Sequence, residues 1–182
     1  ERLHHNNDKP QIIIQLYPWD PSKKMGTHAI TVKDNRWGRC DIKSTSLLPN
    51  ILAARKAHLS QCIEAIFINQ NNHVLEGTSS NVFMVKNSVL ITAPSSSNLL
   101  NGITRQIVIK IAKLNDIQVD ESLHSLQDLY NADEVFTTSS YKHVHPITKI
   151  DNKPINNEIT GKTTQFLRKK YLEVMNLHYE MV

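Results

Sequence analysis

The sequence predicts a strand-rich α+β fold. Short β-prone runs recur in pairs separated by tight polar turns, which is the pattern of hairpins. Longer segments with helical spacing lie between these hairpins, but they do not alternate with single strands as βαβ units require. The 182 residues suffice for one good core or two small ones, and they contain neither a glycine excess nor a low-complexity block.

The strands are predicted from short apolar or alternating runs that end at turn-forming residues. The first is the isoleucine-rich run 11–17, which has a proline on each side and is followed by a polar loop, residues 18–24. The other expected strands are residues 28–33, 64–69, 73–76, 82–85, 89–92, 117–121, 134–138 and 144–150. Polar turns at residues 70–72, 86–88 and 151–153 are typical of hairpins.

Four helices are predicted from the spacing of apolar residues, at residues 47–62, 101–114, 125–130 and 158–177. In the first of them, the larger apolar residues are expected to form the apolar stripe of an amphipathic helix, with alanines between them. These residues are Leu48, Ile51, Leu52 and Leu59. Pro49 fits the first turn of this helix, where no backbone donor is needed.

Charge and composition argue against several classes of function. The chain carries 21 basic and 17 acidic residues, and its densest basic group, residues 168–170, falls on the last helix as part of a solvated face. We therefore expect no nucleic-acid binding. No apolar run is long enough to cross a membrane and no charged-then-apolar leader is present, so we expect no membrane association. Cys40 and Cys62 do not suggest a disulfide framework, which favours the cytoplasm.

Two further classes lack their motifs. The glycine fingerprint of a dinucleotide-binding fold is missing, and neither a helical histidine pair nor a cysteine cluster marks a metal site. His143 and His145 have the spacing of a strand and are interpreted as residues at a sheet end. No metal is therefore expected.

Lys43 is the centre of the most distinctive segment, residues 36–46. It is expected where a strand leaves the sheet, among small polar residues and before a helix. Two interpretations stay open from these residues alone. Most lysines are solvated charges, whereas a Schiff-base lysine needs its amine among apolar and small neighbours, where it can lose its proton.

Glu76 ends an expected strand and precedes a bend of small residues, 77–81. It is either a surface carboxylate or an anion that faces the ring nitrogen of a pyridine cofactor. Such a cofactor acts as an electron sink only while that nitrogen is protonated, and a nearby anion favours the proton. The small side chains and backbone donors of the bend suit a loop that packs on a flat ring.

Two other segments could bind an anion. Residues 101–105 open a helix, where free backbone N–H groups and the helix dipole attract negative charge, and Gly102 lets the backbone approach closely. Residues 137–140 end a strand with four hydroxyls, which either decorate the sheet end or bind a phosphate. Each signal alone is also common in proteins without such a site.

These motifs together resemble the fold-type IV pyridoxal phosphate enzymes, and within them the D-amino acid aminotransferases. The resemblance rests on residues 36–44, 76–83, 102–105 and 138–140, in the family's order, and covers essentially the whole chain. The Cys-Asp-Ile-Lys-Ser sequence at residues 40–44 is its most specific part and favours these enzymes over the branched-chain aminotransferases. The resemblance implies the family's larger domain, with sheets or a pseudo-barrel and flanking helices.

The resemblance implies that the chain binds pyridoxal 5'-phosphate through Lys43, which also moves the proton between the substrate and cofactor carbons. Glu76 would face the pyridine nitrogen, and Leu100 would pack on the ring. The other cofactor-binding residues that it implies are Ser79, Ser80, Gly102, Ile103, Thr104, Ser139 and Ser140. Arg2 and His4 match an Arg-x-His motif that binds the substrate carboxylate.

The implied activity converts D-alanine and 2-oxoglutarate to pyruvate and D-glutamate. The implied partners are small-molecule amino acids and 2-oxo acids, and the implied assembly is a homodimer. The family has a smaller domain before the larger one. Residues 1–17 match only its end and the linker, and residues 18–182 match the larger domain. Two alternatives stay open. One is an aminodeoxychorismate lyase, which shares the lysine but eliminates pyruvate, and the other is an inactive fragment of the cofactor domain.

Overall fold

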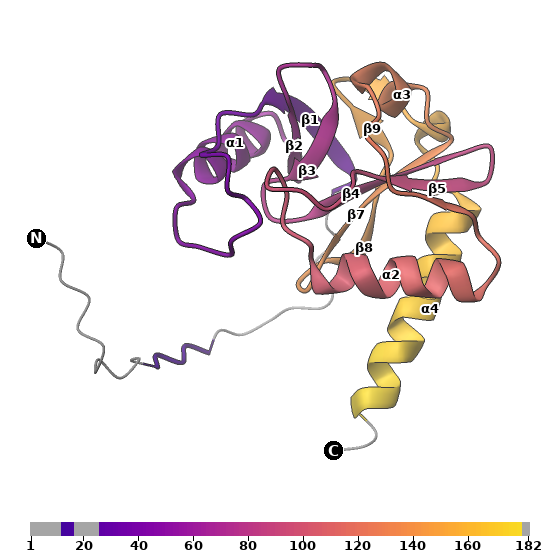
Figure 1. The fold of residues 1–182 in the computed structure, drawn as a ribbon. Helices are drawn as coiled ribbons and strands as arrows, with labels where there is room; N and C mark the ends of the chain where they lie inside the picture. Colours follow the sequence, from indigo (N-terminus) through magenta and orange to yellow (C-terminus); the bar gives the residue numbers. More distant parts are fainter. Residues whose placement is uncertain (1–11, 17–25, 180–182) are drawn as a thin grey trace, which may run out of the picture.

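The computed structural model describes residues 12–16 and 26–179, and these form a strand-rich α+β fold (Figure 1). The strands are β1 (His28–Lys33), β2 (Glu64–Ile68), β3 (Val74–Gly77), β4 (Asn81–Lys86), β5 (Val89–Thr92), β6 (Val119–Asp120), β7 (Glu134–Ser139), β8 (His143–Ile147), β9 (Lys149–Ile150) and β10 (Lys153–Pro154). The helices are α1 (Leu48–Leu59), α2 (Ile103–Leu114), α3 (Leu126–Tyr130), the short 3-10 helix η1 (Asn156–Glu158) and α4 (Lys162–Tyr179). The predicted fold class is confirmed.

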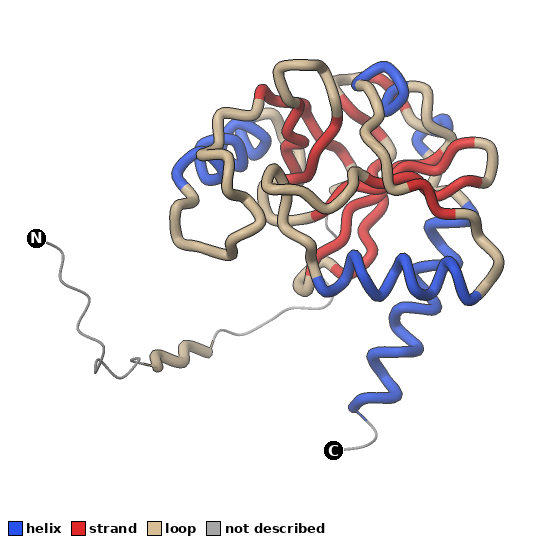
Figure 2. Tube along the Cα trace, viewed as in Figure 1, coloured by secondary structure: helices blue, strands red, loops and turns tan. Residues whose placement is uncertain are grey.

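The strands form one branched sheet, in the order β10-β9-β1-β2-β3-β4-β5-β6. Its branch point is β4, which pairs with β3, β5 and β7, and β8 extends the branch beyond β7 (Figure 2). Most pairs are antiparallel, but β1 runs parallel to β2 and β9, and β5 runs parallel to β6. Asn81 lies opposite Thr138 in the β4–β7 pair, so the bend before β4 and the end of β7 meet at one end of the sheet.

The helices cover different parts of this sheet. α1 packs against β1 and β2, in an apolar cluster that includes Phe67 and Leu75. α2 and α4 cross each other and cover β7 and β8 (Figure 1). In the same apolar cluster, the rings of Phe83 of β4 and Phe136 of β7 stack with centroids 5.0 Å apart. A third cluster joins Ile150 of β9 to residues of α3. None of the helices in the described part is both long and apolar enough to cross a bilayer.

Most strands form within two residues of their predicted positions. The run 11–17 is different: its described residues, 12–16, have no regular secondary structure, and their large side chains are exposed. A strand belongs to a ladder with a neighbouring strand, and the ladders of the described sheet do not include this run. The strand predicted at residues 144–150 is divided in two by Thr148, whose N–H donates to the carbonyl of Thr27.

Helix α4 begins later than predicted, because Asn156–Glu158 form a turn with left-handed φ values. Glu134, at the start of β7, caps the helix instead. Its carboxylate accepts hydrogen bonds from the N–H groups of Thr163 at 2.9 Å and Thr164 at 2.7 Å, and from the Thr164 hydroxyl at 2.7 Å. An anion at a helix N-terminus is stabilised by the free N–H groups and the helix dipole, so β7 fixes where α4 starts.

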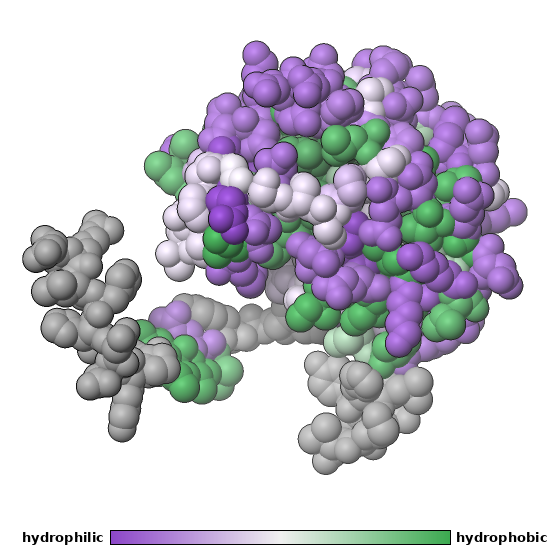
Figure 3. Space-filling view, viewed as in Figure 1, coloured by the Kyte–Doolittle hydropathy of each residue, from purple (hydrophilic) through white to green (hydrophobic). Residues whose placement is uncertain are grey.

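The large apolar residues of helix α1 were expected to form its buried stripe, but they do not pack on the sheet. Leu48, Ile51, Leu52 and Leu59 are between 57% and 75% exposed. The buried residues are Ala53 and Ala57, which pack with Ala65 and Phe67. Small side chains let the helix approach the sheet closely, and the large ones lie outside (Figure 3 shows apolar surface on the side where α1 lies). Pro49 lies in the first turn, as predicted.

Two substitutions on α1 test this orientation. Ala57→Leu is expected to lower the free energy of unfolding by about 1–3 kcal/mol, because the added atoms overpack the contact with β2. Leu52→Gln should change it by less than about 0.5 kcal/mol, because the side chain is already exposed. Urea unfolding followed by circular dichroism measures both. A larger loss for Leu52→Gln than for Ala57→Leu would mean that the leucines are buried, and a loss that does not change with protein concentration would place them against the sheet.

Candidate active site

A cavity of about 490 Å³ lies where four separate segments of the chain meet. Its lining comes from the loop between β1 and α1, the bend between β3 and β4, the start of α2, and the end of β7 with the turn that follows. These are the segments that carry the sequence motifs. The branched sheet explains why they meet, because β4 places the bend beside β7.

Lys43 lines this cavity from the loop between β1 and α1. The expectation that it lies at a strand end is wrong, because β1 already ends at Lys33. Its side chain is exposed and not enclosed by apolar neighbours. Within residues 12–16 and 26–179 it has no hydrogen-bond or ion-pair partner, so its amine is available to a molecule in the cavity.

Glu76 lies next to the end of β3, as predicted, and is 6% exposed. Its Oε1 atom accepts a hydrogen bond from Arg36 Nη1. Its Oε2 atom accepts from the backbone N–H of Leu100 at 3.0 Å and from the side-chain amide of Asn81 at 3.3 Å. Three of the cavity segments therefore meet at this one carboxylate.

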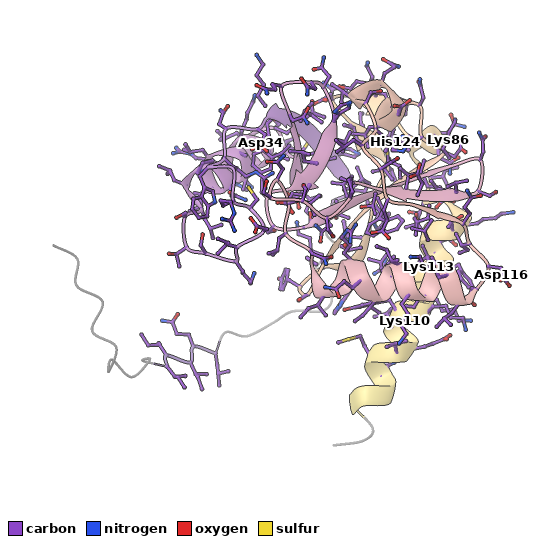
Figure 4. All side chains as sticks on the ribbon, viewed as in Figure 1. Asp34, Lys86, Lys110, Lys113, Asp116 and His124 are labelled. Carbon is purple, nitrogen blue, oxygen red and sulfur yellow. The ribbon has the colours of Figure 1, made fainter. Side chains whose placement is uncertain are left out.

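Arg36 is a residue to which the sequence interpretation gave no role. Its side chain is 3% exposed, and its guanidinium lies 4.3 Å from the centre of the Phe67 ring. Nε and Nη2 donate to the two carboxylate oxygens of Asp34 at 2.9 Å, and Nη2 also donates to the Asn98 carbonyl at 2.8 Å. Asp34 lies on the α1 side of the molecule, away from the lysines labelled on α2 (Figure 4). The signal in the sequence is an acid and a base two residues apart at the start of the lysine segment.

Burial and charge act in opposite directions on this pair. Burial raises the pKa of Glu76 from 4.5 to about 7, although the charge and the hydrogen bond of Arg36 oppose the shift. Burial also lowers the pKa of Arg36, but its contacts with Asp34 and Glu76 outweigh that effect and raise the pKa above its ordinary value. Arg36 therefore stays a cation. Glu76 is poised to ionise fully when a further positive charge enters the cavity.

The bend 77–81 presents its two serines differently. Ser79 is exposed and lines the cavity. Ser80 also lines the cavity but is 7% exposed, and its hydroxyl donates to Glu64 at 2.8 Å. Of the two, Ser79 is the one whose hydroxyl has no partner within the described residues.

The start of α2 offers free donors to the cavity. Gly102 is the N-cap, and no side chain caps the helix. The N–H groups of the first turn, including those of Ile103 and Thr104, have no acceptor inside the helix, and all three residues line the cavity. The Thr104 hydroxyl is turned to the protein, 3.3 Å from the Tyr171 hydroxyl of α4. The backbone, more than the threonine side chain, is therefore the anion-binding element here.

The end of β7 adds a hydroxyl to which the sequence interpretation gave no role of its own. Thr138 is 1% exposed and lines the cavity, and its hydroxyl has no hydrogen-bond partner within the described residues. Ser139 accepts a hydrogen bond from the backbone N–H of Lys142 at 3.0 Å, and Ser140 lines the cavity from the following turn. A buried polar atom without a partner is rare in proteins, so Thr138 marks a place for a polar ligand atom.

Gly102 is required for a neighbouring side chain as well as for the helix start. A Cβ atom at this position would lie 2.5 Å from Asn81 Oδ1. The Asn81 amide in turn donates to the Leu100 carbonyl at 2.7 Å and to Glu76. The missing side chain of Gly102 thus leaves room for the asparagine that holds the segment before α2.

Arg2 and His4, expected to bind the substrate, lie outside the described residues. His145 donates from Nε2 to the Gly26 carbonyl at 2.7 Å, and burial lowers the pKa of its ring, so it is a neutral residue of the sheet end. Across residues 12–16 and 26–179, no cluster of three or more His, Cys, Asp or Glu side chains could hold a metal ion.

Comparison with known proteins gives one family and several relatives. A family model described as amino-transferase class IV matches residues 2–150. The chain is 45% identical to the D-alanine aminotransferase of Listeria monocytogenes over 148 residues. This aligned stretch covers 81% of this chain and 51% of the relative. It is 41% identical over 159 residues to the D-alanine aminotransferase of Bacillus licheniformis, covering 86% and 56%. The chain thus spans about half the length of the curated relatives it matches.

Solved structures with a similar fold include branched-chain amino acid aminotransferases. One, from Thermobaculum terrenum and in its PLP-bound holo form, superposes with a TM-score of 0.74 at 31% identity, over 81% of this chain and 50% of the other. The enzyme from Escherichia coli superposes with a TM-score of 0.71 at 28% identity, over 80% and 51%.

Arg36→Met is expected to raise the pKa of Glu76 further above 7, because the charge and the hydrogen bond of Arg36 lower it. Carbon-13 NMR of labelled glutamate in the cofactor-free protein measures this pKa. Arg39→Met is the control, because Arg39 pairs with Asp41. Equal pKa values of Glu76 in both variants would contradict the pairing.

The same raised pKa fixes the sign of a pH effect on stability. Between about pH 4.5 and about 7 the native state holds a proton on Glu76 that the unfolded chain has lost. The contribution of Glu76 to the free energy of unfolding is therefore greatest below this window and falls as the pH rises through it. Glu76→Gln should remove this part of the pH dependence in urea unfolding of the cofactor-free protein.

A double-mutant cycle tests the fit of Gly102 against Asn81. Gly102→Ala is expected to lower the free energy of unfolding by about 1–3 kcal/mol, because its methyl group overlaps the Asn81 side chain. Asn81→Ser shortens that side chain, so the double variant should lose less than the sum of the two single losses. Additive losses in urea unfolding would show that the two positions do not compete for space.

Proposed function

The chain belongs to the class IV aminotransferases, and from this premise we propose that it supplies the cofactor site of an enzyme that transfers amino groups between D-amino acids and 2-oxo acids. The D-amino acid preference is supported by the 45% and 41% identity to D-alanine aminotransferases. Solved branched-chain enzymes match at 28% to 33% identity. The proposed reaction is D-alanine with 2-oxoglutarate, giving pyruvate and D-glutamate.

The proposed cofactor is pyridoxal 5'-phosphate, and one observation carries this proposal. The buried Thr138 hydroxyl without a partner lies in the same cavity as the free N–H groups of α2, the Glu76 carboxylate and the Lys43 amine. The Thr138 hydroxyl and the N–H groups of α2 fit the phosphate of that cofactor. The Glu76 carboxylate fits its ring nitrogen, and the Lys43 amine fits its aldehyde. The solved enzyme from Thermobaculum terrenum is a PLP-bound form, which also supports the proposal.

When bound, pyridoxal phosphate links covalently to amines and accepts the electrons released when the Cα–H bond of the substrate breaks. Lys43 would supply the amine and carry the proton between carbon atoms. Glu76 would keep the ring nitrogen of the cofactor protonated. The positive charge of that nitrogen would favour the ionised form of Glu76, and the Glu76 anion would in turn favour the proton on the nitrogen. Arg36 would hold Glu76 in place through its own contacts with Asp34.

The N–H groups of Ile103 and Thr104 would bind the phosphate together with the Thr138 hydroxyl. The other lining residues nearby are Gly102 at the start of α2, Ser139 at the end of β7 and Ser140 just after it. Backbone donors at a helix start suit an anion because the helix dipole adds to their hydrogen bonds. Leu100, whose backbone is fixed by Glu76 and Asn81, would pack on the ring, with Ser79 and Ser80 along the same side.

The substrate side of the proposal rests on the sequence. Arg2 and His4 would bind the α-carboxylate, because a guanidinium offers a planar pair of donors that matches it. We assign residues 1–17 to the end of a smaller domain and its linker, and residues 18–182 to the larger, cofactor-binding domain. Cys40 and Cys62 carry free thiols, which supports a cytoplasmic setting.

A homodimer is the proposed assembly. The large apolar residues of α1 are exposed in the single chain, and adjoining apolar surface is typical of interfaces. Gel filtration with light scattering measures the mass. A mass that corresponds to one chain would contradict the proposal.

Amino-group exchange is the test of the proposed function. With pyridoxal phosphate bound, the protein that carries this chain should exchange amino groups between D-alanine and 2-oxoglutarate in a two-stage reaction, with L-alanine nearly inert. Pyruvate and D-glutamate are measured by coupled assays. Faster turnover of L-alanine or L-leucine would contradict the preference. Pyruvate release from aminodeoxychorismate, without exchange, would favour the lyase.

Lys43→Ala should abolish this exchange, and Lys56→Ala, at an exposed position on α1 outside the cavity, should leave it unchanged. Borohydride reduction followed by peptide mapping identifies the lysine to which the cofactor is fixed. Lys142 also lines the cavity, so attachment there would overturn the role of Lys43.

A further inference from the structure

Glu64 is a buried carboxylate with no part in the proposed function. It is the first residue of β2 and is 1% exposed, and it does not line the cavity. Its side chain nevertheless contacts two segments that do: the bend 77–81 and the turn after β7. It therefore lies directly behind the cavity wall.

Nearly every acceptor position of Glu64 is used. Its Oε1 atom accepts from the backbone N–H groups of Thr78 at 2.9 Å and Ala65 at 3.1 Å, and from the Thr78 hydroxyl at 2.5 Å. Its Oε2 atom accepts from the Ser80 hydroxyl at 2.8 Å and lies 3.4 Å from Lys142 Nζ. The Lys142 ammonium also donates to the Ile63 carbonyl at 3.1 Å. A buried carboxylate whose partners are all donors fixes the positions of those donors, because each would be costly to leave unpaired.

The bend is packed onto this carboxylate without spare room. A Cβ atom at Gly77 would lie 2.8 Å from Glu64 Cδ and would overlap the Ser80 hydroxyl. The bend thus meets Glu64 through a glycine at its start and through hydroxyls of Thr78 and Ser80. The backbone conformation of the bend at the cavity therefore depends on the position of the Glu64 carboxylate.

We propose that Glu64 is a positioning residue, whose carboxylate holds the bend 77–81 and, through Lys142, the turn after β7 in the form that binds the cofactor. The inference rests on the proposed function for the identity of that cofactor. Glu64 contacts the wall segments and not the cavity, so it acts through Thr78, Ser80 and Lys142.

The chemistry requires the charged group and not only its shape. In Glu64→Gln an NH2 group, which is a donor, replaces one carboxylate oxygen. In one orientation of the amide this group faces the Thr78 donor, and in the other orientation it faces the Ser80 donor. The substitution also removes the carboxylate from Lys142, for which Glu64 is the only ion-pair partner among residues 12–16 and 26–179.

Glu134 provides a matched control. It is also a buried strand glutamate, and its carboxylate likewise accepts from backbone and side-chain groups of two threonines, Thr163 and Thr164. Its partners belong to α4 and do not line the cavity. Glu134→Gln therefore removes a comparable buried charge while leaving the cavity wall in place.

The experiment compares Glu64→Gln with Glu134→Gln in two measurements. Hydrogen exchange of the cofactor-free protein should be faster at the Thr78 amide in the first variant, and faster at Thr163 and Thr164 in the second. Titration with pyridoxal phosphate should show about tenfold weaker binding and a shifted absorption maximum of the bound cofactor for Glu64→Gln only, since hydrogen bonds to a charged group are lost. Thr78→Val, which keeps the charge and removes one donor, is a milder second variant and should weaken binding in the same direction.

The outcomes separate this inference from the proposed function. Equal losses of cofactor affinity in the two glutamine variants, or unchanged exchange at Thr78 in Glu64→Gln, would overturn the positioning role. If the unmodified protein did not bind pyridoxal phosphate, the proposed function would fail. The exchange measurement would then still decide whether Glu64 holds the bend.

Discussion

The buried ion pair of Arg36 and Glu76 is the interaction on which the cavity depends. Arg36 reaches it from the loop after β1 and also binds the Asn98 carbonyl, while Glu76 binds the Leu100 amide. One pair of charges therefore joins the lysine loop, the end of β3 and the segment before α2. Removing Arg36 would leave the buried Glu76 without its cation, and such a loss typically costs about 3–5 kcal/mol, whereas Arg36 without Glu76 would keep its contacts with Asp34. The other ion pair of the loop that carries Lys43, among the residues that the structure describes, is internal to the loop and joins Arg39 to Asp41.

The branching of the sheet at β4 is the second constraint. β4 pairs with β7 on one side and with β3 and then β5 on the other, so two strand ends that are far apart in the sequence lie together. Buried carboxylates recur around this arrangement. Glu64 binds the bend before β4, Glu76 binds the segment before α2, and Glu134 caps α4. Each accepts hydrogen bonds from backbone N–H groups that lie outside the strand ladders, at Thr78, at Leu100 and in the first turn of α4.

Much of the fold could be predicted from local pattern. Turn residues and short alternating runs predicted the hairpins, because both signals act within a few residues. Helix α1 was placed correctly along the chain but with the wrong face buried, since the choice between alanines and leucines depends on how closely β2 approaches. The strand prediction for the run 11–17 was also wrong over its described part, because strand formation needs a partner that local sequence does not reveal.

The candidate site divides in the same way. Lys43, Glu76, Gly102 and Ser140 could be named from motifs, and they line one cavity. The partners of these residues could not be found so easily. Arg36 and Glu64 act through contacts between segments 40 and 14 or 16 positions apart in the chain, and Thr138 is distinguished from its neighbours only by its unsatisfied hydroxyl.

Gly77 and Gly102 share a feature with an evolutionary consequence. At each position, the space that a side chain would occupy is already filled by a polar side chain from a neighbouring segment: Ser80 and Glu64 at the first, Asn81 at the second. Neither glycine has the left-handed backbone that other residues avoid. Selection at these positions therefore acts on the pair and not on the glycine alone. A lineage can acquire a larger residue there only together with a smaller partner, so the two sites should covary among descendants of a common ancestor.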